Sequence, residues 1–224
     1  MRIFLVISVL LYSLTSFCQT AVTPCGSSFV DTRDGTVYGT VLIGTQCWMN
    51  QNLNVGVQVM NFLQSDNDII EKSCYRNDAK KCSIYGGLYT WDEAMQNQNN
   101  SKGICPSGYH IPTIREWEKL IEFLGPEVAG QKLKASQDSV GISWDGTNDS
   151  RFLALPAGAG NHEYFKREGQ WAVFWSSTAF TTERAWFTQL DSYWYSNPPK
   201  YKSMYAGNYY LKSNGFSIRC ILDE

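Results

Sequence analysis

The clearest pattern of apolar and polar residues lies between residues 113 and 125. Thr113 and Glu116 have the spacing of a capping box, in which each side chain bonds the backbone amide of the other residue. The apolar residues that follow at helical spacing are Trp117, Leu120, Ile121 and Leu124. Gly125-Pro126 then ends the segment. The pattern predicts an amphipathic helix of about twelve residues with one buried face.

Two shorter helices are predicted on either side of this one. Thr90 and Glu93 repeat the capping-box spacing and predict a helix over residues 91–97. Polar residues 96–102 predict a surface loop, and a further short helix is expected over residues 127–135.

Strand patterns occupy both ends of the chain. Residues 28–32 and 36–44 flank Asp34-Gly35, a dipeptide suited to a tight turn, and predict a hairpin. Residues 49–73 lack a clear period, which predicts a loop with one short strand. From residue 152 onward the pattern predicts mainly strands and turns.

The last predicted strand has one face expected in the core. Along this strand one set of side chains, expected in the core, alternates with a second set. The first set is Phe216, Ile218, Cys220 and Leu222, and the second is Ser217, Arg219 and Ile221. The sequence ends at Glu224 directly after this strand, so no further sorting or anchoring domain is expected.

The amino terminus has the pattern of a secretory signal peptide. Met1-Arg2 is followed by the nearly all-apolar residues 3–14, about twelve residues against the roughly 20 that span a bilayer. We expect residues 1–18 to be removed and residues 19–224 to form one secreted or cell-surface domain with no transmembrane segment. Lipidation of Cys18 is the alternative, which the bulky Phe17 before it disfavours.

Composition narrows the class of protein. The chain has 224 residues and a formal net charge of −2, which fits a single globular domain. No run of Lys or Arg concentrates positive charge, so nucleic acid is excluded as the expected partner.

The cysteines predict a disulfide framework. Of seven cysteines, removal of Cys18 leaves an even set of six: Cys25, Cys47, Cys74, Cys82, Cys105 and Cys220. Cys25 and Cys47 lie outside the two arms of the predicted hairpin, and Cys74 and Cys82 enclose a short polar loop, which favours these two pairings. A structural metal site is disfavoured because the chain has two histidines and no Cys-x-x-Cys pair.

No catalytic residue is predicted. We interpret His110 as a turn residue, since it lies just before the helix cap. Ser176 and Ser177 have no nucleophile elbow around them. The acidic pairs Asp92-Glu93 and Glu116/Glu118 are explained by the favourable charge of helix first turns, rather than by glycoside hydrolysis.

Two stretches suggest binding. Asp145, Asn148 and Asp149 carry oxygen ligands of the kind that calcium prefers, but the same residue types are equally common in turns. We therefore expect that the protein has no cofactor. Residues 191–210 are rich in aromatic rings that suit sugar faces and protein surfaces alike. The ligand-binding residues expected here are Tyr193, Trp194, Tyr195, Tyr201 and Tyr205. The alternative is that half of the rings in this stretch pack into the core.

Several phrases together resemble the Fibrobacter succinogenes major paralogous domain, found in exported proteins and lipoproteins of the Fibrobacter and Bacteroides lineages. They are DGTVYGTVLIGTQCWMNQNLN (34–54), CSIYGGLYTWDEAM (82–95), ICPSGYHIPTIREWEKL (104–120), FLALPAGAG (152–160), FWSSTAF (174–180) and GFSIRCILD (215–223). The resemblance covers about residues 30–223, with departures at Tyr109, where the family more often has Trp, and Arg151, where it more often has Gly.

The resemblance implies an α+β, C-type lectin-like fold with small twisted antiparallel sheets, two flanking helices and long loops. By the same likeness Cys105 pairs with Cys220. The family brings no settled activity. We therefore expect a secreted, non-enzymatic binding or adhesion module that presents the aromatic loop to an extracellular glycan or surface protein. The alternatives are an enzyme of the formylglycine-generating type, which requires a free thiol, and a structural component of a cell-surface assembly.

Overall fold

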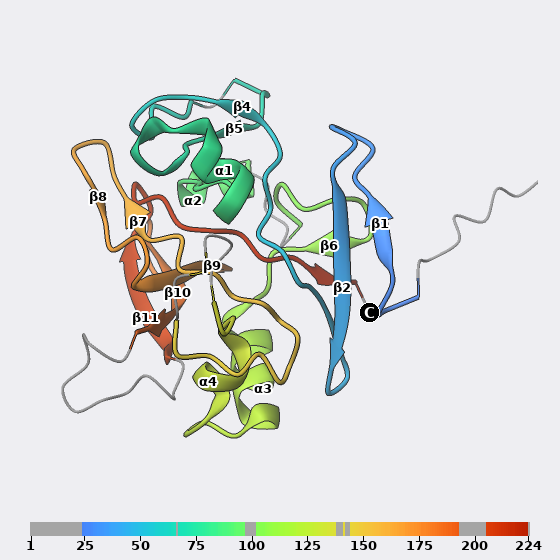
Figure 1. Cartoon of the computed structure of the whole chain (residues 1–224). Coiled ribbons are helices and arrows are strands. Elements are labelled where there is room, and N and C mark those ends of the chain that lie inside the picture. Colours follow the sequence, from blue (N-terminus) through green and yellow to red (C-terminus); the bar gives the residue numbers. More distant parts are fainter. Residues whose placement is uncertain are drawn as a thin grey trace, which may run out of the picture.

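The computed structural model describes residues 24–65, 67–96, 102–137, 141, 144–192 and 205–223 as a mixed α+β fold with mainly antiparallel sheets, few helices and three disulfides (Figure 1). Helices α1 and α2 lie at one end of the molecule, and α3 and α4 lie at the other. No helix in these residues is long and apolar enough to cross a membrane. The helical elements are η1 (Tyr75–Asn77), α1 (Ala79–Tyr85), α2 (Trp91–Met95), α3 (Ile114–Leu124) and α4 (Ala129–Leu133).

The strands form one larger sheet, one three-stranded sheet and two short pairs. They are β1 (Ser28–Val30), β2 (Val37–Ile43), β3 (Gln46–Met49), β4 (Val57–Gln58), β5 (Glu71–Lys72), β6 (Tyr109–His110), β7 (Ala159–Gly160), β8 (Phe165–Lys166), β9 (Trp171–Ala179), β10 (Arg184–Asp191), β11 (Tyr205–Leu211) and β12 (Ile221–Leu222).

The five-stranded sheet has the order β1-β2-β3-β12-β6 and joins both ends of the described chain. The predicted hairpin is confirmed, with Val30 opposite Val37, and β3 adds a third antiparallel strand to it. Strand β12 lies between β3 and β6, since Ile221 pairs with both Trp48 and His110. The C-terminal end of the chain therefore lies beside the N-terminal hairpin (Figure 1).

The three-stranded sheet β11-β10-β9 separates two buried clusters. Phe174 of β9 joins Trp117 of α3 in one cluster. Trp175, the next residue along β9, joins Phe216 in the other. Because successive side chains of a strand point to opposite faces, this part of the sheet is covered on both sides.

The expectation of one buried face on the last strand was wrong. Ser217 and Arg219 are as fully buried as Ile218 and Cys220. Residues 215–220 are all buried, and their segment runs through the middle of the molecule (Figure 1). Regular strand pairing is confined to β12, and the preceding residues make single bridges, such as Tyr89 with Phe216.

The predicted capping boxes have different outcomes. At α3 the box is complete, because the Thr113 amide donates to Glu116 Oε2 (2.7 Å) and the Glu116 amide donates to Thr113 Oγ1 (3.3 Å). At α2 the Glu93 amide donates to Thr90 Oγ1 (3.4 Å), but the carboxylate of Glu93 accepts from the Glu71 amide instead (2.9 Å). Glu93 is buried against the preceding loop, so its carboxylate bonds that loop instead of capping its own helix.

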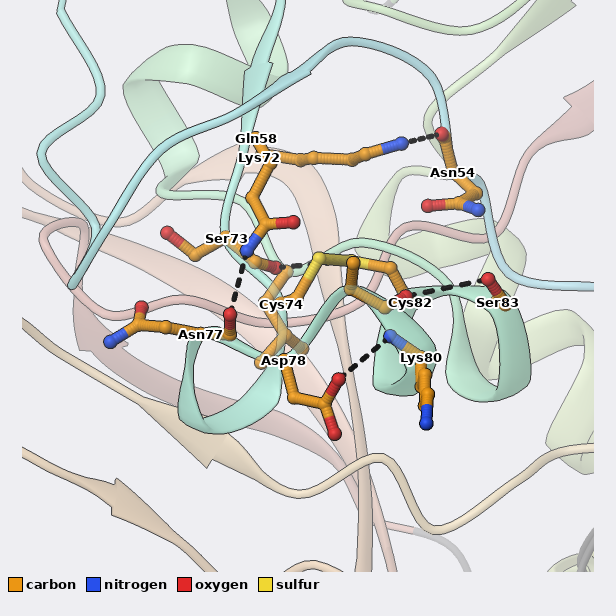
Figure 2. Close-up of a disulfide and its surroundings, with 12 residues drawn as sticks. Asn54, Gln58, Lys72, Ser73, Cys74, Asn77, Asp78, Lys80, Cys82 and Ser83 are labelled. Atoms are coloured by element: carbon orange, nitrogen blue, oxygen red, sulfur yellow. Dashed lines mark hydrogen bonds between the residues drawn. A yellow bond between two sulfur atoms is a disulfide. The ribbon is translucent and has the colours of Figure 1, made fainter.

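All three disulfides are those expected: Cys25–Cys47, Cys74–Cys82 and Cys105–Cys220. The segment enclosed by Cys74 and Cys82 was expected to be a polar loop, but it contains η1 and the start of α1 (Figure 2). Asp78 provides the reason, because its carboxylate accepts from the Lys80 amide (2.9 Å) and so caps a helix that has no strong apolar pattern.

The loop prediction for residues 49–73 also needs a correction, because two short strands form there instead of one. Strands β4 and β5 pair in parallel, with Val57 opposite Glu71 and Gln58 opposite Lys72. Each has two residues, too few for a period to be recognised in the sequence.

Candidate functional site

The structure leaves most of the predicted ligand-binding residues untested. Tyr193, Trp194, Tyr195 and Tyr201 lie outside the described residues. Tyr205 begins β11 opposite Gln189 of β10, which places it at the end of the three-stranded sheet from which this aromatic segment extends. The binding role of these five residues stays a prediction.

A surface cluster of rings lies on the same sheet. Phe180 and Tyr209 stack with centroids 3.9 Å apart and planes 12° apart, and Trp186 packs edge-on to both at 5.0 and 5.6 Å. Phe180 and Tyr209 remain 44% and 41% exposed, and Trp186 is half-buried. We call Phe180, Trp186 and Tyr209 the aromatic platform.

Strand register brings these rings together. Trp186 of β10 lies directly opposite Tyr209 of β11, and side chains of directly opposed residues share a face. Phe180 follows β9, where its amide donates to the Arg184 carbonyl (2.8 Å) and so closes the turn that lays its ring beside the other two. The flanking Ala185 and Phe187 point to the core.

A cation borders the platform. The guanidinium carbon of Arg184 lies 5.6 Å from the centroid of the Tyr209 ring, and the side chain is exposed. Among the described residues no carboxylate lies within 4.0 Å of this guanidinium. The surface therefore offers flat apolar rings next to a positive charge, which suits non-covalent binding of a planar or ring-shaped ligand.

Sequence reasoning missed two members of the platform. Trp186 lay within the strands and turns predicted after residue 152 and Phe180 within the family phrase at 174–180, and neither was predicted to bind a ligand, whereas Tyr209 was included in the aromatic stretch. The alternation of Ala185, Trp186 and Phe187 could have placed Trp186 away from the core. The neighbouring Tyr210 contacts Phe187 and Phe216 of the core with centroids 6.1 Å apart in both cases, although Tyr210 is itself 40% exposed.

Two of the three predicted calcium ligands, Asn148 and Asp149, make hydrogen bonds within a turn. Asn148 has φ 55°, and its Oδ1 accepts from the Leu153 amide (3.0 Å). The Asp149 amide donates to Thr147 Oγ1 (3.4 Å). No three His, Cys, Asp or Glu side chains within the described ranges gather as metal ligands. Calcium binding by Asp145, Asn148 and Asp149 stays a prediction.

His110 connects two carboxylates. Its Nδ1 lies 2.7 Å from Asp223 Oδ1 and its Nε2 lies 2.9 Å from Glu116 Oε1. Burial disfavours the charged imidazolium, but the hydrogen bonds and charges of Glu116 and Asp223 outweigh it and raise the pKa of His110 above 6.5. The imidazole thus joins β6, the start of α3 and the residue after β12.

This arrangement predicts a pH-dependent stability. Because the folded pKa of His110 is raised, its contribution is fully present below pH 6.5 and is lost as the pH rises through the folded-state value. Replacing His110 with Gln is expected to lower the free energy of unfolding at pH 6 by about 2 kcal/mol, since hydrogen bonds to charged groups are lost. Urea unfolding between about pH 6 and 9 measures both effects.

The other histidine provides the control. His162 is exposed and lies 3.6 Å from the exposed Glu163, so His162→Gln should keep the pH dependence of the unmodified protein. An equally steep decline in His110→Gln would contradict the assignment. At acid pH the relevant group is Glu116. Burial favours its neutral form, but its hydrogen bonds with His110 and Thr113 outweigh burial and lower the pKa of Glu116 below 4.5. The stability that Glu116 adds is therefore lost as the pH falls through its folded-state value.

Comparison with known families finds one match. The family model described as the Fibrobacter succinogenes major domain (Fib_succ_major) matches residues 41–222. Neither the comparison with curated proteins nor the comparison with solved structures found a match.

Proposed function

Since the chain belongs to the Fibrobacter succinogenes major domain family, we propose that it is an exported, non-enzymatic module that binds a glycan through the aromatic platform, with residues 193–205 as further proposed contacts. The observation that carries this proposal is the exposed stack of Phe180 and Tyr209 with Trp186 beside it. Exposed rings on a regular sheet offer a rigid apolar surface at low cost in conformational entropy. Such a surface matches the C–H face of a sugar ring.

Export is supported by two independent features. Residues 1–18 have the composition of a signal peptide. The six cysteines from Cys25 to Cys220 are all in disulfides, a state typical of oxidising compartments. We propose that the mature domain begins at Gln19 and is secreted or held at the cell surface.

A C-type lectin-like fold is part of the proposal. It is supported by the sheet that joins the amino-terminal hairpin to β12 and by helices at both ends of the molecule (Figure 1).

The disulfides favour binding over catalysis of the formylglycine-generating type. That chemistry depends on reactive thiolates, and no cysteine in the described part of the chain has a thiol. Titration of the native mature protein with a thiol reagent should therefore detect no free cysteine.

One observation favours a second function, as a component of a surface assembly. Strand β1 is an edge of the five-stranded sheet, and Val30 at its end is 56% exposed. An unpaired edge with exposed apolar residues can add a strand from another chain. This function predicts polymers, or co-purifying partners, in the absence of glycan binding.

A polysaccharide pull-down tests the glycan proposal. Trp186→Ala and Tyr209→Ala are each expected to reduce glycan binding about tenfold, because central aromatic contacts dominate such surfaces. Phe123→Ala is the matched control, since this ring is also exposed but belongs to α3. Loss of binding in the Phe123 variant to the same degree would contradict a role specific to the platform.

The predicted loop residues need a separate arm of this experiment. Joint replacement of Tyr193, Trp194 and Tyr195 by Ala should also weaken binding if the segment extends the platform. Unaltered binding in this triple variant, with loss in the platform variants, would remove the loop from the site and leave the platform. Retention of a surface-protein partner without glycan binding would identify the ligand as protein.

A further inference from the structure

A separate cavity of about 350 Å³ opens where four segments of the chain meet. It is bordered by residues 62–65 and 67–69 of the loop before β5, by α2, by the β7–β8 turn at His162 and by Ser213 after β11. None of the three rings of the aromatic platform lines it. The volume lies at the lower end of the range for small-ligand sites and fits one compact ligand.

The loop wall of this cavity is held by bonds from the disulfide region. The Phe62 amide donates to Ser73 Oγ (2.9 Å), and the Asn61 amide donates to Asn77 Oδ1 (2.9 Å). Ser73 and Asn77 lie beside the Cys74–Cys82 bond (Figure 2). The wall is therefore preformed by its supporting residues before any ligand arrives.

Hydrogen bonds also fix the opposite wall. Gln64 accepts from the Thr90 amide (2.7 Å) and donates to the Leu88 carbonyl (3.0 Å), which ties the loop to the entrance of α2. One carboxylate oxygen of Glu93 accepts from the Glu71 amide (2.9 Å), as described above. These contacts place a buried carboxylate of α2 in the lining.

Phe62 provides an aromatic wall in a strained backbone conformation. Its φ is 58°, a region costly for a bulky residue. The ring packs so closely on Gly215 that a Cβ there would lie 1.7 Å from it, and a Cβ at Gly160 would lie 2.6 Å away. Glycine is therefore required at both positions, because any side chain there would collide with the Phe62 ring.

The charge of the lining is negative. Asp68, Asp92 and Glu93 face the cavity, and among the described residues that line it His162 is the one basic side chain. Lys212 lies 4.0 Å from Asp92, but its ammonium group sits over the Trp91 ring, also at 4.0 Å, and does not line the cavity. The formal charge of the lining therefore favours an organic cation over an anion.

Neutral polar groups complete the lining. Gln96 supplies an amide and Ser213 supplies a hydroxyl, beside the apolar Ile69 and Phe62, whereas the Asn67 amide is already bonded to Ser65, Glu71 and the Ile69 backbone. Amides and hydroxyls both donate and accept, as the hydroxyl groups of a sugar do. We infer that this cavity binds an amino sugar, with its protonated amine near Asp68 and Asp92, its hydroxyls on Gln96 and Ser213, and its ring face on Phe62.

Calorimetric titration at about pH 6 with glucosamine, glucose and glucuronate tests this inference. Glucosamine should bind more tightly than glucose, and glucuronate should not bind. Joint replacement of Asp68 and Asp92 by Asn should weaken glucosamine binding about tenfold and leave glucose binding unchanged within about twofold, because only the charge is removed. Glu93 is kept because it holds the loop.

Glu122→Gln with Glu127→Gln is the matched control, since it removes two exposed acidic charges outside the cavity and leaves the net charge equal to that of the Asp variant. Equal binding of glucosamine and glucose, or equal loss in both double variants, would overturn the inference. A lysine amide acetylated at its α-amine keeps a protonated side-chain amine but has no sugar ring. If it bound as tightly as glucosamine, the inference would also be overturned, since a sugar would then not be required. The platform variants Trp186→Ala and Tyr209→Ala should bind glucosamine as the unmodified protein does. The proposal for the cavity and the proposal for the platform are therefore tested independently.

Discussion

Replacing Cys105 and Cys220 by Ala is expected to lower the free energy of unfolding by about 5 kcal/mol, because the disulfide closes a loop with a sequence separation of 115. The bond ties the residues before β6 to the central C-terminal segment, and both cysteines are buried. Its loss frees the denatured chain over half its length. Guanidinium unfolding without reductant, at 25 °C, measures the change.

The Cys74–Cys82 bond provides the internal comparison. Its sequence separation is 8, so the matched Ala pair should cost about 2.6 kcal/mol by the same loop-entropy relation. If the shorter bond proved to contribute as much as the longer one, the account of the central disulfide would be wrong. A Cys105/Cys220 variant that does not fold at all agrees with the larger effect, provided that the Cys74/Cys82 variant does fold.

Replacing Arg219 by Met is expected to cost about 4 kcal/mol, because the partners of a buried charge are left without donors. Its guanidinium is fully buried and donates to Asn52 Oδ1 (2.6 Å), to the Met49 carbonyl (3.1 Å) and to the Phe152 carbonyl (2.5 Å). It also lies 4.3 Å from the centroid of the Phe152 ring. One side chain thus joins the final segment to two other parts of the core.

Arg219 keeps its charge at neutral pH even though burial lowers its pKa to about 9. The control is Arg115→Met, because Arg115 is 87% exposed and pairs with Glu118 on the surface of α3. That change should alter the free energy of unfolding by less than about 1 kcal/mol. Thermal and urea unfolding of both variants check the prediction, and similar small losses in the two would contradict the proposed role of Arg219.

Local elements of the fold could be predicted because their signals lie in adjacent residues. Helix α3 follows from its capping box and apolar spacing, and the hairpin follows from Asp34-Gly35 between two strand patterns. Family resemblance supplied the pairing of Cys105 with Cys220, which local spacing does not indicate.

The other features depend on contacts between distant residues. Glu93 has the spacing of a capping-box residue, yet it bonds a residue 22 positions earlier in the chain. Arg219 looked like an outward-facing strand residue, but its partner Asn52 is 167 residues away. Likewise the platform requires the register between β10 and β11, which no local pattern fixes.

Calorimetric titration of the tightest-binding oligosaccharide, into the unmodified protein and into a Trp186→Ala/Tyr209→Ala double variant, tests the central claim most directly. The account predicts saturable binding to the unmodified protein and a loss of at least about tenfold in affinity in the folded double variant. Equal affinity in the two folded proteins would contradict it.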